Sequence, residues 1–381
     1  MRIALLTTDN RQDCGDYGAP APWFGAAPEA LLQGLAVLPD LEVHVLSCTQ
    51  QLVAAPPKLA PNVFFHSLLV PKLGWARTGF QGCIRAVRRE LKVIQPDIVH
   101  GQGTERDCAL SAVFSGFPNV LTVHGNVRRV AQVTRARAFS YWWVAARLET
   151  LALRRACGVF CNSEYTEQLV RPYGRRTWRV PNALRTRFFT AAREPAQTGC
   201  LLLNVGFIGP RKRQLELLDR LQELHQQGVK LECRFIGSAQ PHTRYVRAFL
   251  EKLKPLEQAG VARYVGLKPL NELIALFDSS AALIHMPMEE AFGLVVAEAL
   301  ARGLKVFASR VGGIPDITAG VRDAELFQAD DWRGLNAAIG RWACAGCPRR
   351  GQARDLMRGR YHPEVIARRH VEIYKEVLRH A

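Results

Sequence analysis

Two glutamates separated by seven intervening residues form the most informative pattern in this sequence. Glu290 lies in a loop after an apolar, strand-like run, and Glu298 lies about two turns into the helix that this loop opens. Both carboxylates can therefore face one ligand that lies along the start of the helix. Gly293 lets the main chain approach that ligand closely, and the free N–H groups of a first helical turn attract phosphate. The alternative is a surface acid followed by an ordinary helix carboxylate, because this spacing is common by chance.

A glycine-bearing and strongly basic loop, residues 204–214, follows a second apolar run. Its glycines, Gly206 among them, let the main chain approach a diphosphate, and a cation at the next helix start can neutralise charge on a leaving group. The candidate cations are Arg211, Lys212 and Arg213. A dinucleotide-type G-x-G-x-x-G motif is absent, which argues against an oxidoreductase. A solvated basic turn is the competing interpretation.

Two histidines end apolar runs in the first half of the chain. His124 follows residues 119–123, and His100 ends the run 97–100. A lone histidine is more often structural than functional, so neither residue indicates a site by itself. A long loop after the first apolar run leads to Gly25, at the start of an expected helix.

The candidate residues lie in loops that are far apart in the sequence, so they can form one site only if the fold brings these loops together. Short apolar, β-branched runs alternate with longer segments of helical period, which is typical of βαβ units and parallel sheets. We predict strands at 2–8, 42–48, 63–68, 97–100, 119–123, 157–161 and 177–180, and then at 200–206, 231–237, 262–266, 281–285, 304–308 and 324–327. The predicted helices include one continuous helix at 135–154. Sheets of this kind bind ligands at the carboxyl ends of their strands.

The length of 381 residues argues for two domains, at roughly 100–200 residues per domain. Residues 193–199 are turn-forming and lack a periodic apolar pattern, so they interrupt the alternation of strands and helices. We predict a linker there. The expected segments are a first domain at 1–192, a second domain at 200–360 and a C-terminal helix at 361–381. The fold class is α/β, with two tandem Rossmann-like, doubly wound domains facing a cleft.

The segment Pro287–Leu300 resembles the signature of glycosyltransferase family 4, which reads E-x7-E in an E-G-F-G-L-x-x-x-E setting. This chain differs at Ala291, where the family has glycine. The resemblance implies that Glu290 contacts the transferred sugar and that Glu298 contacts the nucleotide ribose. It also implies a donor-binding surface that includes the following residues: Phe292, Gly293 and Leu294.

The basic loop is similar to the family's V-G-R-x-x-x-x-K-G segment, in which an arginine and a lysine hold the donor diphosphate. Lys212 falls on the lysine position, but Phe207 occupies the arginine position. Arg211 or Arg213 could supply the missing cation from a neighbouring position. Gly206 belongs to the same donor-binding loop.

The first half of the chain carries weaker matches to the family. The ending T-x-H-G places His124 beside the donor sugar in the family, and a glycine-containing loop near Gly25 approaches the donor phosphates and the acceptor. The turns 180–183 and 309–316 resemble the family's I-P-N-G and S-x-x-G-G-x-P-E turns. The resemblance therefore assigns catalytic roles to His124, Lys212 and Glu290.

By this resemblance the fold is GT-B, and the last helix crosses back to the first domain. The implied reaction is metal-independent transfer of a sugar from a nucleotide diphosphate sugar to an acceptor hydroxyl, with retention at the anomeric carbon. No cofactor is expected besides this substrate, and the acceptor is expected to be a glycan or a lipid-linked molecule. Two alternatives remain: an epimerase or phosphorylase of the same fold, and a degenerate binding protein, which Phe207 and Ala291 motivate.

A formal charge of +17 favours anionic partners such as phosphates, nucleotides or an anionic membrane surface. Residues 71–89 and 128–155 interleave arginines with aromatic residues, a composition typical of segments that lie on an anionic bilayer. The alternative is that the aromatic rings pack in the core of the first domain. No recognised nucleic-acid-binding module is present, so we expect no nucleic-acid partner.

Ten cysteines are scattered through the chain, several beside apolar runs. We expect reduced thiols in a cytoplasmic protein, peripheral on the membrane if it meets one. The single C-x-x-C, Cys344 to Cys347, is expected to be incidental because zinc sites normally need a second pair. No apolar stretch approaches the ~18 residues of a membrane span.

Overall fold

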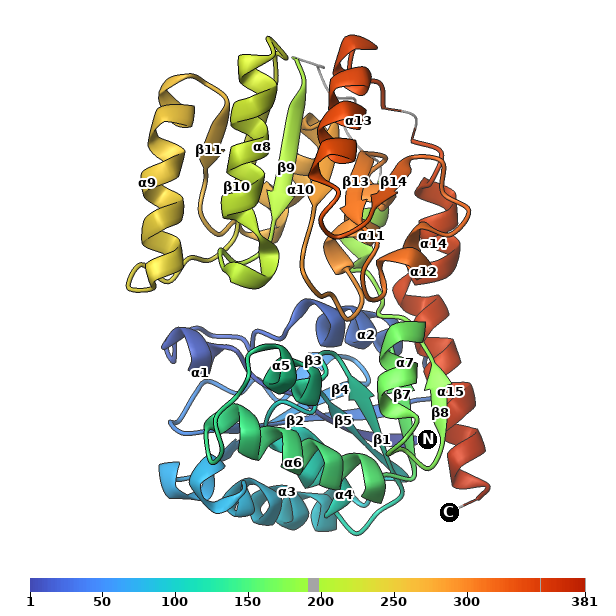
Figure 1. The fold of residues 1–381 in the computed structure, drawn as a ribbon. Helices are drawn as coiled ribbons and strands as arrows, with labels where there is room; N and C mark the ends of the chain where they lie inside the picture. The colour runs from blue at the N-terminus through green and yellow to red at the C-terminus, as the bar shows by residue number, and fades with distance from the viewer. Residues whose placement is uncertain (191–198, 350, 381) are drawn as a thin grey trace. The chain divides into compact units, whose positions relative to one another are not determined.

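The structure is a computed structural model that describes residues 1–190, 199–349 and 351–380. Its contacts divide the chain into two compact units, Met1–Arg185 with Tyr361–Ala381, and Thr186–Arg360 (Figure 1). Of the predicted linker 193–199, all residues except Gly199 lie outside the described part of the chain. Both units are α/β and Rossmann-like, which confirms the predicted fold class.

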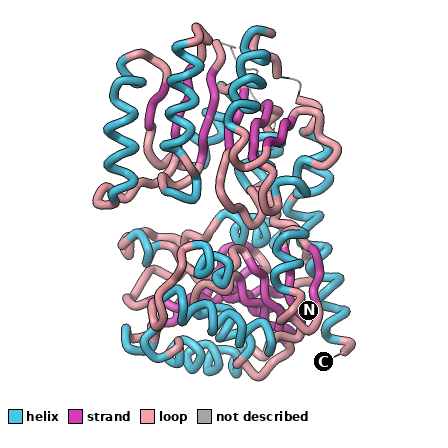
Figure 2. Tube along the Cα trace, in the orientation of Figure 1, coloured by secondary structure: helices cyan, strands magenta, loops and turns pink. Residues whose placement is uncertain are grey.

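The first unit contains an eight-stranded sheet in the order β3-β4-β2-β1-β5-β6-β7-β8. Its strands pair in parallel except that β3 is antiparallel to β4. Figure 2 shows the strands of this sheet in magenta among cyan helices. The strand bounds are β1 Arg2–Leu6, β2 Glu42–Thr49, β3 Lys58–Ala60, β4 Val63–Leu69, β5 Ile98–Gln102, β6 Asn119–Val123, β7 Gly158–Cys161 and β8 Thr177–Arg179. The sequence did not indicate β3.

Helices cover both faces of this sheet. The bounds are α1 Arg11–Cys14, α2 Ala26–Ala36, η1 Lys72–Gly74, η2 Ala76–Thr78, α3 Gln81–Ile94, α4 Asp107–Val113, α5 Val127–Val133, α6 Tyr141–Arg155, α7 Glu164–Val170 and α15 Pro363–Leu378. Alternate residues of β1 enter two different cores, Ala4 with α3, α4 and α6, and Leu5 with α2 and α15. At Gly34 a Cβ would lie 2.1 Å from the carbonyl oxygen of Pro363, so glycine permits the close approach of α2 and α15.

The second unit contains a six-stranded parallel sheet in the order β11-β10-β9-β12-β13-β14. The strand bounds are β9 Leu201–Val205, β10 Glu232–Ile236, β11 Ala262–Tyr264, β12 Ala282–His285, β13 Lys305–Ser309 and β14 Ala324–Phe327. The helices are η3 Thr186–Phe189, η4 Pro210–Lys212, α8 Gln214–Gln226, α9 Arg244–Gln258, α10 Leu270–Ser279, α11 Leu294–Ala301, α12 Ile314–Thr318, α13 Trp332–Cys344 and α14 Arg354–Tyr361. The strand order reverses between β9 and β12, which defines the position where doubly wound sheets bind ligands.

The predicted continuous helix at 135–154 is wrong. The chain forms α5 and then α6, separated by residues 134–140, and both Arg135 and Phe139 adopt positive φ angles of 48° and 62°. Left-handed backbone at non-glycine residues breaks the helix without a glycine or proline to mark the break in the sequence.

The expectation that all ten cysteines are free thiols is also corrected. Cys200, before β9, forms a disulfide with Cys347, after α13, and their Cα atoms are 5.7 Å apart. The other eight cysteines are free. Cys344 of the C-x-x-C motif is an exposed free thiol, so the motif itself forms no disulfide. No helix in the described ranges combines the length and apolarity that a membrane span requires.

Candidate functional site

The two loops with the strongest sequence signals follow adjacent strands at the centre of the second sheet. The basic loop follows β9, and the loop that carries Glu290 follows β12, whose residues pair with β9 in parallel. Because parallel strands end at the same edge of a sheet, both loops lie at the position where the strand order reverses. The topology therefore brings together two sequence segments that are about 80 residues apart, as the hydrogen bond from Asn204 to Ile284 also shows.

Lys212 and Glu290 form an ion pair at this edge. Lys212 Nζ lies 2.6 Å from Glu290 Oε2, and His285 Nε2 lies 3.1 Å from the same oxygen. His285 is the last residue of β12 and is almost completely buried. The structure thus places a cation, a carboxylate and an imidazole around one oxygen atom.

The charges of this cluster determine its protonation. Burial alone would raise the pKa of Glu290, but the charge of Lys212 and the bonds from His285 and Lys212 outweigh burial and lower the pKa to about 2. Burial lowers the pKa of His285, so near pH 7 the ring is neutral and its Nε2–H donates to the carboxylate. Near neutral pH the cluster is therefore Lys⁺, Glu⁻ and neutral His.

The backbone of Glu290 is held by the turn after β13. Gly313 N donates to the carbonyl oxygen of Glu290, and Ser309 Oγ donates to the carbonyl oxygen of Pro287. Gly312 has a φ of 55°, and a Cβ there would lie only 1.6 Å from the Glu290 carbonyl oxygen. The two-glycine turn that the sequence singled out therefore positions the Glu290 loop.

The basic loop is braced by its own residues. Buried Gln214 accepts from Gly209 N and donates to Phe207 O, while the Lys212 side chain lies over Gly206. Gly206 has a φ of 154°. The Lys212 side chain therefore packs directly against the main chain of the loop at Gly206.

Phe207, which occupies the family's arginine position, lies next to two cations of the same loop. Its ring centroid is 5.6 Å from the Arg211 guanidinium carbon and 6.0 Å from Lys212 Nζ. Arg211 also lies 3.7 Å from Glu289 Oε2 and is partly exposed. Arg211 is therefore placed beside the loop, where it could supply the cation that is missing at position 207.

Arg213 is directed elsewhere. Its guanidinium donates to the carbonyl oxygen of Ala329 and to Asp330, and it stacks on Trp332 at 4.7 Å. Its φ of 58° forms the turn between η4 and α8. These contacts hold the Arg213 guanidinium against residues 329–332, and the donor contact suggested by the sequence stays a prediction.

The remaining predicted residues of the second unit lie in and before α11. Gly293 caps the helix with a φ of 103°, and its missing Cβ leaves room for Ile314. Leu294 begins the helix, Phe292 is buried in the preceding loop, and Glu298 is 6% exposed on the second turn. Glu298 is thus on the same helix whose N-terminus follows the Glu290 loop.

His124 lies after β6 in the first unit. Its Nε2 bonds Gln102 Oε1 at 2.8 Å, and burial lowers its pKa to about 4, so the ring is neutral near pH 7. Asn182 is close enough to offset that shift slightly, but the buried Nδ1 makes no hydrogen bond of normal geometry with the described residues. In this structure Nδ1 is buried from solvent.

Glu105 is a titratable neighbour of His124 that the sequence did not indicate. Its Oε1 accepts from Gly125 N at 3.1 Å, and a Cβ at Gly103 would meet both Glu105 Oε2 and the His124 ring. Burial raises the pKa of Glu105 to about 7, because only main-chain N–H groups offset its loss of solvent. No sequence motif indicates this residue, since it lies in an ordinary loop after β5.

Gly25 is the N-cap residue of α2. A Cβ at this position would make only an ordinary 3.7 Å contact with Pro28, and the φ of −60° suits any residue. Among the described residues, nothing requires glycine here, and the approach of this loop to the donor phosphates stays a prediction. His100, in contrast, is fully buried between Thr122 and Tyr374 and belongs to the core.

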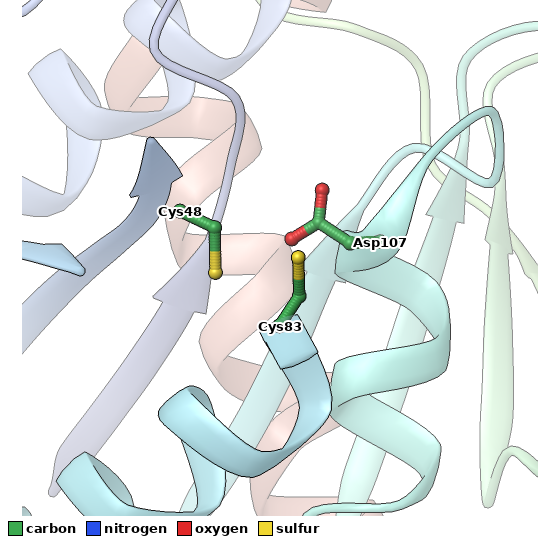
Figure 3. A group of neighbouring side chains, drawn as sticks. All are labelled: Cys48, Cys83 and Asp107. Carbon is green, nitrogen blue, oxygen red and sulfur yellow. The ribbon is translucent and has the colours of Figure 1, made fainter. Parts of the chain in front are cut away.

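One group of side chains in the described part of the chain has metal-ligand geometry. Figure 3 shows Cys48, Cys83 and Asp107 pointing toward one another, with ligand atoms within 4.8 Å. The hydrogen bond with Cys83, burial and the charge of Asp107 raise the pKa of the Cys48 thiol well above its usual value. Metal binding requires thiolates, so these surroundings favour a hydrogen-bonded thiol over a metal ligand.

The two basic aromatic segments differ in exposure. Trp75 and Phe80 of residues 71–89 are buried in the core, so that segment does not present its aromatic rings at the surface. In residues 128–155, Phe139, Tyr141 and Trp142 are exposed. The surface composition expected for both segments is therefore found in only one.

Family models match both halves of the chain. Residues 30–188 match the model described as Glycosyltransferase Family 4, and residues 188–344 match Glycosyl transferases group 1. Together with the two Rossmann-like units, these matches define a glycosyltransferase of the GT-B class. The two models together span residues 30–344, so the chain belongs to the glycosyltransferases that they describe.

Two curated relatives share local similarity. The sulfoquinovosyl transferase SQD2 of Arabidopsis thaliana is 35% identical over 31% of this chain and 21% of its own length. The D-inositol 3-phosphate glycosyltransferase of Corynebacterium diphtheriae is 34% identical over 26% of this chain and 24% of its own length. The matches thus span less than a quarter of each relative.

Solved structures of similar fold cover the whole chain. Sucrose-phosphate synthase from Thermosynechococcus elongatus has a TM-score of 0.76 at 18% identity, and each chain is covered completely. Anabaena HepE, solved in complex with UDP-glucose, has a TM-score of 0.72 at 16% identity, with 99% of this chain and 100% of HepE covered. At these identities the likeness concerns the fold.

Proposed function

We propose that this protein transfers a sugar from a nucleotide diphosphate sugar to an acceptor hydroxyl, with retention at the anomeric carbon and without a metal ion. The Lys212–Glu290 ion pair at the strand-order reversal carries the proposal. The UDP-glucose complex of the structurally similar HepE supports a nucleotide-sugar donor. We expect the second unit to bind this donor.

In the proposed reaction, the bond between the anomeric carbon and the diphosphate oxygen breaks while the bond to the acceptor oxygen forms. The proton of the acceptor hydroxyl passes to the leaving diphosphate. Lys212 and the N-terminus of α11 stabilise the negative charge of this leaving group. Glu290 binds the sugar hydroxyls, and Glu298 binds the nucleotide ribose.

Residues of the first unit are proposed to act on the acceptor side. His124 is the exception, since we propose that its neutral ring lies beside the donor sugar. The acceptor is proposed to be a glycan or a lipid-linked molecule, handled in the cytoplasm at a membrane face. The exposed rings of Phe139, Tyr141 and Trp142 support contact with such a surface.

The test is turnover of UDP-, GDP- and ADP-sugars with a panel of sugar and glycolipid acceptors. The proposal expects release of the nucleoside diphosphate, with product of the same anomeric configuration as the donor by NMR. Inverted product would refute retention, and activity that requires an added divalent ion and stops with chelator would refute metal independence. Epimerised free donor, or a requirement for inorganic phosphate, would indicate the related epimerase or phosphorylase.

Phe207 favours a second candidate, a family member that binds its ligand without turnover. The family's arginine is absent at this position, and Arg211 is the neighbouring cation that could replace it. The variant Phe207→Arg restores the family residue, and nucleotide release by this variant and by the wild type distinguishes a transferase from a binding protein. A binding protein without turnover would bind donor yet release no nucleotide in the wild type.

A further inference from the structure

A groove with a volume of about 700 Å³ lies between α5 and α6 of the first unit. Volumes of this size are typical of small-molecule sites. None of the residues assigned above to the donor or to the cluster around His124 lines it. The groove therefore needs an explanation of its own.

Four arginines line the groove. Arg128 and Arg135 are seven positions apart at α5 and just after it, and Arg147 and Arg154 are seven positions apart on α6. On α6 a spacing of seven residues is about two helical turns, so Arg147 and Arg154 project from one side of that helix. The two pairs thus supply guanidinium groups from both walls of the groove.

The protein compensates the charge of these arginines only in part, since Arg128 alone among them acts on a carboxylate, and its charge partly offsets the burial that raises the pKa of Glu149. Among the described residues, no carboxylate oxygen lies within the 4.0 Å ion-pair distance of any of the four guanidinium groups. Glu149 is the single acid from Arg128 to Arg155, and it is 1% exposed. Its carboxylate accepts from Thr104 Oγ1 and from the main-chain N–H groups of Val127 and Arg128, away from the groove.

Aromatic rings hold three of the guanidinium groups instead. Arg147 lies 4.0 Å from the ring centroid of Trp143, and Arg128 and Arg154 lie 4.5 Å and 5.9 Å from that of Tyr173. Stacking orients a guanidinium while leaving most of its N–H donors unused. The groove therefore presents oriented donors and positive charge that no ion pair among the described residues offsets.

We propose that the α5–α6 groove binds a phosphate-bearing ligand, and that this ligand is the phosphate or diphosphate group of the acceptor. The oriented forks of arginine match phosphate oxygens, and several of them together favour a group with more than one negative charge. The assignment to the acceptor rests on the proposed transferase function. The phosphate binding itself does not.

The test is calorimetric titration with inorganic pyrophosphate in a Lys212→Ala background, which weakens the donor site. The variant pair Arg147→Gln/Arg154→Gln removes two charges from the groove. The control pair Arg244→Gln/Arg247→Gln removes two charges from exposed positions of α9 in the second unit. We expect at least about tenfold weaker pyrophosphate binding for the groove pair and less than about twofold change for the control pair.

A second arm identifies the source of the phosphate. Co-sedimentation with phosphatidylglycerol vesicles, and with phosphatidylcholine vesicles as the neutral reference, tests a lipid headgroup. Loss of vesicle binding in the groove pair alone would assign the groove to a lipid-linked phosphate, whereas loss of pyrophosphate binding alone would assign it to a soluble phosphate ester. Equal behaviour of the groove pair and the control pair in both arms would overturn the proposal.

Two further measurements check that the variants are folded and separate the effect of charge from that of the guanidinium fork. Unchanged melting temperatures would show that the variants are folded, as expected for exposed arginines. Arg147→Lys/Arg154→Lys keeps the charge but loses the fork, so it should bind pyrophosphate more weakly than the wild type and more tightly than the glutamine pair. Because the groove is tested without an intact donor site, its failure is distinguishable from failure of donor turnover.

Discussion

Lys212 Nζ lies 2.6 Å from Glu290 Oε2, although the two residues are 78 positions apart in the chain. The contact exists because the loops after β9 and β12 end at the same edge of the sheet. It also determines the charge state of the site, since the lysine is a principal reason that Glu290 stays ionised despite burial. Loss of either residue should therefore have measurable consequences even without substrate.

Lys212→Met should lower the free energy of unfolding by about 2 kcal/mol or more, because it leaves a mostly buried carboxylate without its cation. Lys268→Met is the matched control, since Lys268 pairs with Glu272 at the surface and should contribute less than about 1 kcal/mol. Urea unfolding followed by circular dichroism near pH 7 measures both. Equal effects of the two substitutions would contradict the assigned ion pair.

The effect of Lys212→Met should also depend on pH. The folded pKa of Glu290 is about 2, below its usual value of 4.5, so the stabilisation is complete above about pH 4.5 and is lost as the pH falls toward 2. The stability difference between wild type and variant should therefore narrow on acidification through this window. A difference that stays constant would show that the carboxylate is not held ionised by Lys212.

Gly312→Ala should disrupt the Glu290 loop. A Cβ at this position would collide with the Glu290 carbonyl oxygen, and the φ of 55° disfavours any side chain. We expect a loss of about 2 kcal/mol or more together with weaker donor binding. Gly340→Ala is the control, because Gly340 lies within α13 with open space around it and alanine there should be neutral or stabilising. Similar melting temperatures for the two variants would refute the steric argument.

Glu105 should make the wild type less stable as the pH rises, which is opposite to the effect of the Lys212–Glu290 ion pair, and Glu105→Gln should remove this dependence. Burial raises the pKa of Glu105 from 4.5 to about 7, so the folded state binds a proton that the unfolded state releases, and stability falls as the pH rises through this range. The shift corresponds to a cost on the order of 3 kcal/mol above pH 7. Thermal unfolding at about pH 5 and pH 8 should show Glu105→Gln gaining stability over wild type at the higher pH. An unchanged difference at the two pH values would rule out the raised pKa.

Much of the fold was predictable because buried parallel strands are short apolar runs between turn signals. Strands β6 and β14 were predicted with their observed ends, and the other strands that the sequence indicated differ from the observed ones by a few residues. The missed features lack such a signal. The edge strand β3 is three residues long, and the helix break at 134–140 depends on left-handed backbone at Arg135 and Phe139.

The candidate site was predictable in part. Glu290, Lys212 and the turn at Gly312 carry sequence motifs, and the structure brings all three together. His285 could have been found as a histidine that ends a strand, which was the signal used for His124. The contacts of the Arg213 side chain could not be predicted, because its partners Ala329 and Asp330 are more than 110 positions away in the chain.

Thiol titration tests the disulfide between Cys200 and Cys347. Of the ten cysteines, two are bonded, so denatured protein prepared without reductant should show eight reactive thiols and reduced protein should show ten. Cys344→Ser should lower both numbers by one because Cys344 is free. Ten thiols before reduction would show that the expectation of reduced cysteines was right after all.

The most direct test of the central claim is the melting temperature of the protein with UDP-, GDP- and ADP-sugars. A donor at about 100 times its dissociation constant should stabilise the wild type by about 2.7 kcal/mol. The account predicts that one donor raises the melting temperature of wild type and of the exposed control Lys230→Ala, and that Lys212→Ala and Glu298→Ala abolish the increase. No increase with any donor in folded wild-type protein, or an equal increase in all four proteins, would contradict a nucleotide-sugar site at Lys212 and Glu298.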